Sequence, residues 1–313
     1  MRFPLFAAFA LAALPLMAKT LHVYVLTGQS NSLGAIKGNP ATPARMRPAP
    51  ERFRFWQANF GGYTRVEPPH VPHWEKVRPQ RAAQEVMGPE YGFAQAMEAA
   101  NPWPGDGVAL VKASRDGGGN SHWQPGGEAY TAVTNAVARA LAAVPKGSFK
   151  RVRVEALLYL QGESDKGAEV TAAPERFAAL LDNLRRDLPP LTGADASAMK
   201  AILGEPAHWH GRDTTVRGAT TRNGLKALAD AREDIGWVPT RDLPKISKGD
   251  AMGVHYDGNA QLTIGRRFAA EALIDHAAQR QQHQAFIPAR RQDRHSQQIA
   301  QHIVDDDIHG ERE

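Results

Sequence analysis

The stretch Leu21–Gly34, LHVYVLTGQSNSLG, decides the fold of this chain. Its first half, Leu21 to Thr27, is a strand-like apolar run without turn residues, as expected of a strand that contributes to a core. Its second half changes abruptly to small and polar residues, with Ser30 just behind the end of the run. Ligands of open parallel sheets bind beyond the carboxyl ends of the strands. Ser30 is therefore either the first polar residue of a turn or a side chain placed for chemistry.

The composition of the chain limits the classes of protein to consider. Its 313 residues are 42% hydrophobic, which is enough to bury a substantial core in one large α/β domain or two smaller ones. The formal net charge of +5 is mild, and the Lys and Arg residues are scattered, so nothing favours nucleic acid as a partner. The absence of cysteine excludes a disulfide framework, a thiolate nucleophile and a Cys-ligated metal.

Residues 1–18 have the features of a secretory signal peptide. A charged start at Arg2 precedes an apolar run from Phe3 to Met17 and the small residue Ala18. The run is too short to span a bilayer comfortably, and the strand-like stretch begins directly after Thr20. We therefore expect cleavage after Ala18, a secreted or periplasmic location, and no stable membrane insertion after signal removal. A buried first helix and an uncleaved anchor are the alternatives.

Strand-like runs alternate with helical patterns along the rest of the chain. This alternation predicts a parallel sheet with helices on both faces, in one domain over residues 19–279. The expected strands cover 21–27, 108–113, 152–160, 200–203 and 236–238, and the expected helices cover 91–100, 128–144, 174–187, 220–234 and 260–279.

Two regions lack this periodicity. Residues 36–81 are rich in Pro, Gly and aromatic side chains, which predicts a long ordered loop or small subdomain at a substrate rim rather than core. Residues 280–313 are rich in Gln, Arg and His and have little apolar surface to offset the entropy of ordering. We predict that they form a disordered tail without a functional role.

Four polar or glycine-rich segments lie at predicted strand ends or before the last helix, where the fold can bring them to one crevice. They are residues 28–32, 114–120, 161–165 and 249–257. A serine becomes a nucleophile when a base removes its proton, and histidine has a suitable pKa for that task. Ser30 and His255 would form such a pair. The N–H of Ser30, the N–H of Gly118 or a neighbouring glycine, and the side-chain amide of Gln161 are candidate donors to an oxyanion.

Each motif taken alone has an ordinary structural explanation. A serine after a strand commonly caps a turn or a helix, and a single histidine commonly packs against its neighbours. Trp123 could stack on a sugar or pack in the core. The histidines at 70, 73, 208 and 210 lack the spacing of a zinc motif, so no metal site is predicted. The order and placement of the four segments together favour acyl transfer.

These motifs, in this order, resemble those of the sialate O-acetylesterase and acetylxylan esterase branch of the SGNH-hydrolase superfamily, which is carbohydrate esterase family 6-like. The resemblance extends over about residues 22–273. It implies a three-layer α/β/α, flavodoxin-like fold with a mainly parallel sheet. The motifs that carry it are Gly28–Asn31, Gly88–Glu90, the glycine-rich segment before Trp123, Gln161–Asp165, His255–Asp257 and Gly265–Ala269.

By resemblance, Ser30 matches the nucleophile and His255 the base. Gly118 falls in the oxyanion glycine segment, and Gln161 matches the element that supplies an oxyanion amide. Trp123 and Asn31 are expected to contact the substrate, an acetylated oligosaccharide or polysaccharide. The resemblance implies no metal and no organic cofactor.

One position departs from the family pattern. The family places its aspartate three residues before the histidine, where this chain has Met252. Asp250 is the expected replacement if the loop bulges, while Glu163, Asp257 or a Ser-His dyad are the alternatives. The sequence therefore predicts an exported serine esterase that removes acetyl groups from carbohydrates. A noncatalytic glycan-binding protein on the same fold is the rival hypothesis, and peptidoglycan, sialic acid or a non-carbohydrate ester are other possible substrates.

Overall fold

The computed structural model describes residues 19–34, 44–59, 72–77, 80–81, 85–207, 216–246, 250 and 253–285. Within them lies a main sheet of seven strands in the order β3-β2-β6-β1-β7-β8-β9, all paired in parallel except β2 with β3. The strands are β1 (Thr20–Gly28), β2 (Arg54–Gln57), β3 (Trp74–Lys76), β6 (Gly107–Ser114), β7 (Arg151–Leu160), β8 (Lys200–Gly204) and β9 (Ile235–Val238). A separate antiparallel pair consists of β4 (Gln80–Arg81) and β5 (Glu85–Val86).

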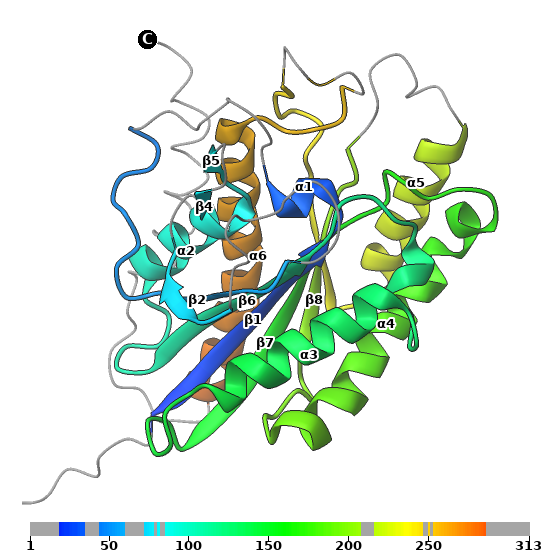
Figure 1. Ribbon diagram of the computed structural model, residues 1–313. Helices are drawn as coiled ribbons and strands as arrows, with labels where there is room; N and C mark the ends of the chain where they lie inside the picture. The colour runs from blue at the N-terminus through cyan, green and yellow to red at the C-terminus, as the bar shows by residue number, and fades with distance from the viewer. Residues whose placement is uncertain are drawn as a thin grey trace, which may run out of the picture.

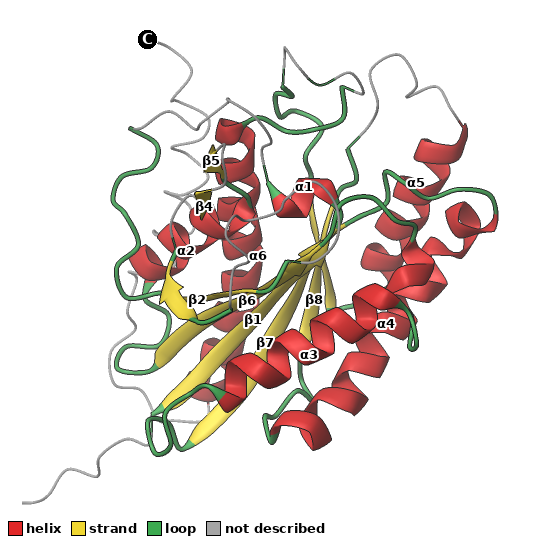
Figure 2. Ribbon diagram, viewed as in Figure 1, coloured by secondary structure: helices red, strands yellow, loops and turns green. Residues whose placement is uncertain are grey.

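Helices cover both faces of the main sheet and complete three layers (Figures 1 and 2). On one face lie α2 (Pro89–Ala100) and α6 (Gly258–Ala285), and on the other lie α3 (Glu128–Ala142), α4 (Ala168–Thr192) and α5 (Val216–Ala231). Two short turns follow strands at one end of the sheet: α1 (Ser30–Leu33) after β1, and the 3-10 turn η1 (Asn120–Trp123) after β6. No helix in the described part of the chain is long and apolar enough to cross a membrane.

Both faces of the central strand β1 are buried, which explains its apolar run. Val23 and Val25 join the core under α3, α4 and α5, whereas Tyr24 and Leu26 join the core under α2 and α6. Burial of a side chain of this size stabilises the folded state by about 1.5–3 kcal/mol relative to an exposed one. One strand therefore helps to hold all three layers together.

The strand order places the reversal point of the sheet, where open α/β sheets bind ligands, beside the end of β1. The run β6-β1-β7-β8-β9 is the flavodoxin-like order, in which the winding direction reverses between β1 and its neighbour β7. At this reversal Gly28 has φ +141, and a Cβ on it would lie only 2.0 Å from the carbonyl oxygen of Leu160. Because glycine permits this approach, the segments that follow β1 and β7 leave the sheet side by side.

The predicted fold class is confirmed, and each predicted strand and helix has a counterpart in the structure. The boundaries of all five predicted helices shift, most of all those of α4 and α6. Helix α4 begins at Ala168 rather than at Pro174, which lies inside the helix instead of starting it. Helix α6 runs to Ala285, past the predicted domain end at residue 279, so the first residues of the predicted disordered tail are helical. Residues 1–18 and 286–313 lie outside the described residues.

The prediction for residues 36–81 was wrong where it excluded this region from the core. Strand β2 pairs with β6 inside the main sheet, and Phe55 and Trp56 are both buried. A four-residue strand flanked by Pro and Gly is too short to show a period of its own. Parts of this region, including residues 35–43 and 60–71, lie outside the described residues.

Candidate active site

Three side chains from distant segments meet beside the end of β1. Ser30 Oγ lies 3.0 Å from His255 Nε2, and His255 Nδ1 lies 3.2 Å from Asp250 Oδ1. Ser30 and His255 are only 4% and 8% exposed, so little water surrounds the pair. The structure thus brings together the predicted nucleophile, the predicted base and the predicted carboxylate.

The second oxygen of Asp250 holds the backbone next to the imidazole. Asp250 Oδ2 accepts hydrogen bonds from the N–H groups of Val254 and His255, each at 2.8 Å. One carboxylate therefore contacts both the ring and the main chain of His255. The loop between them accommodates a spacing of five residues instead of three, while Met252 itself lies outside the described residues.

The turn that carries Ser30 is anchored to the end of β7 and to the segment that follows it. The N–H of Gln29 donates to the carbonyl of Leu160 at 3.1 Å, and the side-chain oxygen of Gln29 accepts from the N–H of Ser164 at 3.1 Å. Ser32 Oγ donates back to the carbonyl of Gln29 at 2.6 Å. Among the described residues, no acceptor pairs with the backbone N–H of Ser30. That donor is therefore available to an oxyanion formed at the serine.

A buried ion pair supports the other end of α1. Lys112 Nζ, on β6, donates to Glu90 Oε2 and to the carbonyl of Leu33, both at 2.7 Å. Glu90 Oε1 accepts from the N–H of Gly88 at 3.0 Å, and burial lowers the pKa of Lys112. The Gly88–Glu90 motif is thus tied to the segment that carries the serine.

Asn31 contacts other protein groups rather than open space. Its side chain is fully buried; its amide donates to Glu163 and to the carbonyl of Val254, and its oxygen accepts from the N–H of Tyr256. The prediction that Asn31 binds substrate is therefore wrong for this structure, because all of its polar atoms are already used.

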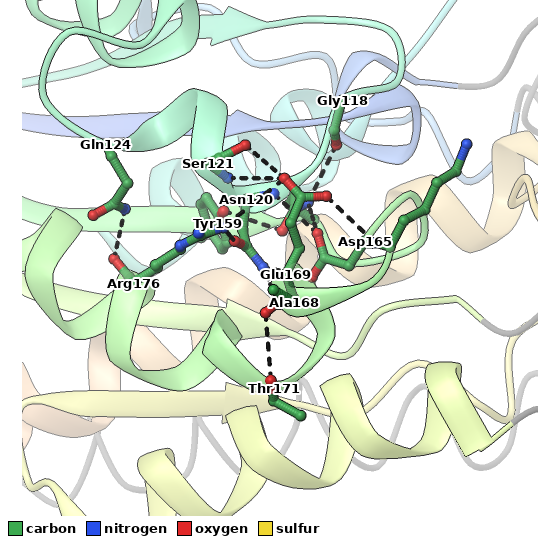
Figure 3. A network of polar contacts seen from close by, with 12 residues as sticks. Gly118, Asn120, Ser121, Gln124, Tyr159, Asp165, Ala168, Glu169, Thr171 and Arg176 are labelled. Carbon is green, nitrogen blue, oxygen red and sulfur yellow. Dashed lines mark hydrogen bonds and ion pairs between the residues drawn. The ribbon is translucent and has the colours of Figure 1, made fainter.

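The glycine-rich segment after β6 is fastened to the segment after β7 through Asp165 (Figure 3). Asp165 Oδ1 accepts from the N–H of Asn120 at 3.0 Å and from Gln161 Nε2 at 2.8 Å, and Oδ2 accepts from Asn120 Nδ2 at 2.9 Å. Burial raises the pKa of Asp165 to about 6, although these hydrogen bonds favour the carboxylate.

A second carboxylate, on α4, holds the same segment from its exposed side. Glu169 Oε1 accepts from the hydroxyl of Ser121 at 2.5 Å, and its hydrogen bonds lower the pKa of Glu169 (Figure 3). Arg176 Nη1 donates to Asn120 Oδ1 at 2.7 Å. Two helical turns of α4 therefore fix the conformation of the loop that contains Gly118.

Gln161 does not have the predicted position of an oxyanion donor. Its amide nitrogen donates to Asp165 Oδ1 at 2.8 Å and to the carbonyl of Gly118 at 3.3 Å, so both amide hydrogens are used within the protein. The side-chain oxygen accepts from the hydroxyl of Tyr159 at 3.2 Å. Gln161 instead orients the Gly118 peptide through the bond to its carbonyl.

Gly118 has a backbone conformation that favours glycine. Its φ is +93, and no acceptor for its N–H is found in the described part of the chain. Gly118 therefore remains a candidate donor.

Trp123 lies in the core. Its ring is fully buried, packs edge-on against Tyr159 and donates its N–H to Thr27 Oγ1 at 3.0 Å. The prediction of a stacking contact with sugar is therefore wrong, and the alternative of core packing holds.

No set of three His, Asp or Glu side chains in the described ranges could hold a metal ion. Of the histidines considered as ligands, His73 is exposed, and His70, His208 and His210 lie outside the described residues.

The pairing of these supporting residues has no signature in the sequence. Asp165 and Asn120 are 45 positions apart, and Lys112 and Glu90 are 22 apart. Their pairing depends on the order of the strands, which a local motif does not contain.

A family model described as "Carbohydrate esterase, sialic acid-specific acetylesterase" matches residues 20–274. No curated protein sequence matches the chain. The match includes every residue of the serine, histidine and aspartate group described above.

Solved structures share the fold at low sequence identity. NanS aligns with a TM-score of 0.63 at 14% identity, covering 83% of this chain and 99% of its own. A protein from Arabidopsis thaliana aligns with a TM-score of 0.59 at 18% sequence identity, covering 82% of this chain and 98% of its own. A carbohydrate acetylesterase from Xanthomonas citri aligns with a TM-score of 0.57 at 16% identity, covering 82% of this chain and 57% of its own. Identities this low are evidence of a common fold alone.

Proposed function

This chain belongs to the carbohydrate esterase family of sialic acid-specific acetylesterases, and from that premise we propose that it hydrolyses acetyl esters on carbohydrates by a serine acyl-enzyme mechanism. Ser30 would be the nucleophile, His255 the general base and acid, and Asp250 the carboxylate that orients the imidazole.

The observation that carries the proposal is the line of contacts from serine to imidazole to carboxylate. Ser30 Oγ and His255 Nε2 are 3.0 Å apart, within the reach that proton transfer requires. With Asp250 beside Nδ1, the favoured tautomer carries its proton on Nδ1 and leaves the Nε2 lone pair facing the serine hydroxyl.

In the first half-reaction Ser30 Oγ attacks the acetyl carbonyl carbon while its proton moves to His255 Nε2. The carbonyl double bond opens to a tetrahedral oxyanion. When this intermediate collapses, the bond to the sugar oxygen breaks, and His255 returns the proton to that oxygen. The deacetylated sugar hydroxyl leaves, and the acetyl group stays on Ser30.

In the second half-reaction a water molecule takes the place of the sugar hydroxyl. His255 removes a proton from the water as its oxygen attacks the acetyl carbon, and a second tetrahedral intermediate forms. Its collapse breaks the bond to Ser30 Oγ, which regains its proton from the imidazolium. Acetate leaves, and the enzyme returns to its starting state.

The developing oxyanion would be stabilised by backbone donors. The N–H groups of Ser30 and of the Gly118 segment are the candidates, and one such donor typically lowers the barrier by about 3 kcal/mol. Gln161 and Asp165 support this role indirectly, since they hold the carbonyl side of the Gly118 peptide.

Asp250 also bears on the rival hypothesis of a noncatalytic glycan-binding protein. That hypothesis depended on Met252 at the usual aspartate position. Because Asp250 approaches the imidazole from two residues further upstream, a carboxylate is present and catalysis is the better-supported function.

The natural substrate would be an acetylated oligosaccharide or polysaccharide. The family description names sialic acid, and the Xanthomonas citri relative is described as a carbohydrate acetylesterase. We further propose that the chain acts outside the cytoplasm, because residues 1–18 have the pattern of a signal peptide.

The test is ester hydrolysis by the purified protein. Wild type should release p-nitrophenol from p-nitrophenyl acetate and acetate from a panel of acetylated xylan, sialic acid and peptidoglycan. Ser30→Ala should lose both activities while keeping its circular dichroism spectrum. No hydrolysis by wild type, or equal hydrolysis by Ser30→Ala, would overturn the proposal.

A further inference from the structure

The side chain of Asn31 joins three segments of the chain at the back of the serine. Asn31 Nδ2 donates to Glu163 Oε1 at 2.8 Å and to the carbonyl of Val254 at 3.1 Å, and Asn31 Oδ1 accepts from the N–H of Tyr256 at 3.1 Å. These groups lie in the turn after β1, the segment after β7 and the loop before α6.

The two backbone partners of Asn31 are the neighbours of His255 on either side. The side-chain amide of Asn31 therefore binds the main chain of the residues before and after His255. Asn31 itself follows Ser30 directly in the chain. This arrangement requires a donor for the Val254 carbonyl and an acceptor for the Tyr256 N–H on the same planar group. Asparagine supplies both, whereas aspartate supplies only acceptors.

The position of Asn31 is itself fixed from two further directions. Gln261 Nε2, on α6, donates to the backbone carbonyl of Asn31 at 3.1 Å. Glu163 Oε1 accepts from the N–H of Ala207 at 3.1 Å as well as from Asn31. Asn31 and Glu163 are both almost completely buried, so the exchange of either bond for water is restricted.

We propose that Asn31 is a positioning residue that sets the distance between the Ser30 hydroxyl and the His255 imidazole. The inference rests on the proposed function, and it replaces the expected substrate contact of Asn31 with a role inside the protein. It separates two tasks. Asp250 orients the ring of His255 through Nδ1, and Asn31 fixes the backbone of His255 relative to the serine.

Asn31→Asp tests this role with almost no change of volume. The variant keeps an acceptor for the Tyr256 N–H, but it places acceptor oxygens against Glu163 and the Val254 carbonyl. Because a misplacement of about 1 Å at a reacting pair can cost about 100-fold in rate, we expect kcat for p-nitrophenyl acetate to fall by about 100-fold. KM should stay within about twofold, since no group that binds substrate is lost.

Two further variants make the result specific. Asn31→Asp/Glu163→Gln removes one of the two facing carboxylates and offers an amide donor to residue 31. It should recover about tenfold of the lost kcat, the size expected for one restored hydrogen bond. Tyr130→Phe removes a hydrogen bond from the first turn of α3 to Asp187 near the end of α4. It is the control for loss of a partly buried hydroxyl and should keep wild-type kinetics.

A spectroscopic readout separates positioning from general destabilisation. The proton of His255 Nδ1, held against Asp250, should give a low-field proton NMR signal in wild type. This signal should persist in Asn31→Asp, whose Asp250 contacts are intact, and disappear in Asp250→Ala. Asn31→Ser supplies the same kinetic comparison if the aspartate variant does not fold.

Wild-type kcat in folded Asn31 variants would overturn the inference. A raised KM with unchanged kcat would also overturn it and would restore the substrate contact. A wild-type protein without esterase activity would instead refute the proposed function, so the two failures are distinguishable.

Discussion

Asp250 lies five residues before His255 in the sequence and beside its ring in the structure. The family pattern places its aspartate at another position. Asp250 is the proposed orienting carboxylate because it contacts both the ring and the backbone of His255. Its chemistry can therefore be tested by a single-atom change.

Asp250→Asn should lower kcat for p-nitrophenyl acetate by about 10³–10⁴-fold, because an amide beside Nδ1 favours the tautomer with its proton on Nε2. That tautomer cannot accept the proton of Ser30. Asp257→Asn is the matched control. Asp257 Oδ1 accepts from the N–H of Ala260 at 2.8 Å at the start of α6, and asparagine caps helices equally well, so this variant should keep wild-type kcat. A loss of less than tenfold in Asp250→Asn would contradict the assigned role.

Asp165 gives the stability of the protein a pH dependence of known sign. Burial raises its pKa to about 6, above its ordinary value of 3.8. The folded state therefore binds this proton more tightly than the unfolded state, and the contribution of Asp165 to stability decreases as the pH rises from about 4 to about 6. A shift of this size corresponds to about 3 kcal/mol.

The comparison of wild type with Asp165→Asn isolates this effect. The free energy of unfolding of wild type, minus that of the variant, should fall by about 2.5 kcal/mol between pH 4 and pH 7, most of the full difference. Urea unfolding at both pH values measures it. A constant difference, or one that rises with pH, would show that the pKa of the Asp165 carboxyl is not raised in the folded protein.

The elements around the site depend on one buried ion pair. Lys112, on β6, and Glu90, on α2, are almost wholly buried and reach the end of α1 through the carbonyl of Leu33. Removal of one partner leaves the other charge without compensation in a low-dielectric environment.

We expect Lys112→Met to lower the free energy of unfolding by about 3–5 kcal/mol. Lys112→Met/Glu90→Gln should recover a large part of this loss, since neither residue is then charged. Urea denaturation of the two variants makes the comparison. Equal stability of the single and double variants would mean that the charge of Glu90 is not what destabilises the single variant.

The elements differ in how clearly the sequence predicts them. Strand β1 was predictable because it is buried on both faces, which produces a long apolar run. Strand β2 was not, although Arg52 and Arg54 alternate with Phe53 and Phe55 in the manner of a half-buried strand. The alternation covers too few residues to stand out among the surrounding Pro and Gly.

The whole molecule brings segments separated by more than 200 positions to one site. Ser30 and His255 are 225 positions apart, and their meeting follows from the strand order that reverses between β1 and β7. Sequence motifs predicted which residues meet, since they lie at strand ends or just before the last helix. They did not predict that Asn31 and Trp123 would be buried, because that depends on side-chain packing between layers.

The first described residues, Lys19 and Thr20, directly follow the expected cleavage site and already belong to the fold. The carbonyl of Lys19 accepts from the N–H of Lys150 at 2.8 Å, and β1 begins at Thr20. Cleavage after Ala18 would therefore leave the central strand complete.

We expect the protein exported by a bacterial host to begin at Lys19. N-terminal sequencing and the intact mass of the secreted or periplasmic protein measure this. Retention of residues 1–18, or a cytoplasmic location, would contradict the export that we propose. A start beyond Thr20 would remove part of β1 and is not expected of an active enzyme.

The central claim is that Ser30 is a nucleophile activated by His255, and reaction with a fluorophosphonate probe tests it most directly. Intact-mass spectrometry should find one adduct per chain, peptide mapping should place it on Ser30, and Ser30→Ala should remain unlabelled. Wild type without an adduct, or an adduct that persists in Ser30→Ala, would contradict the account.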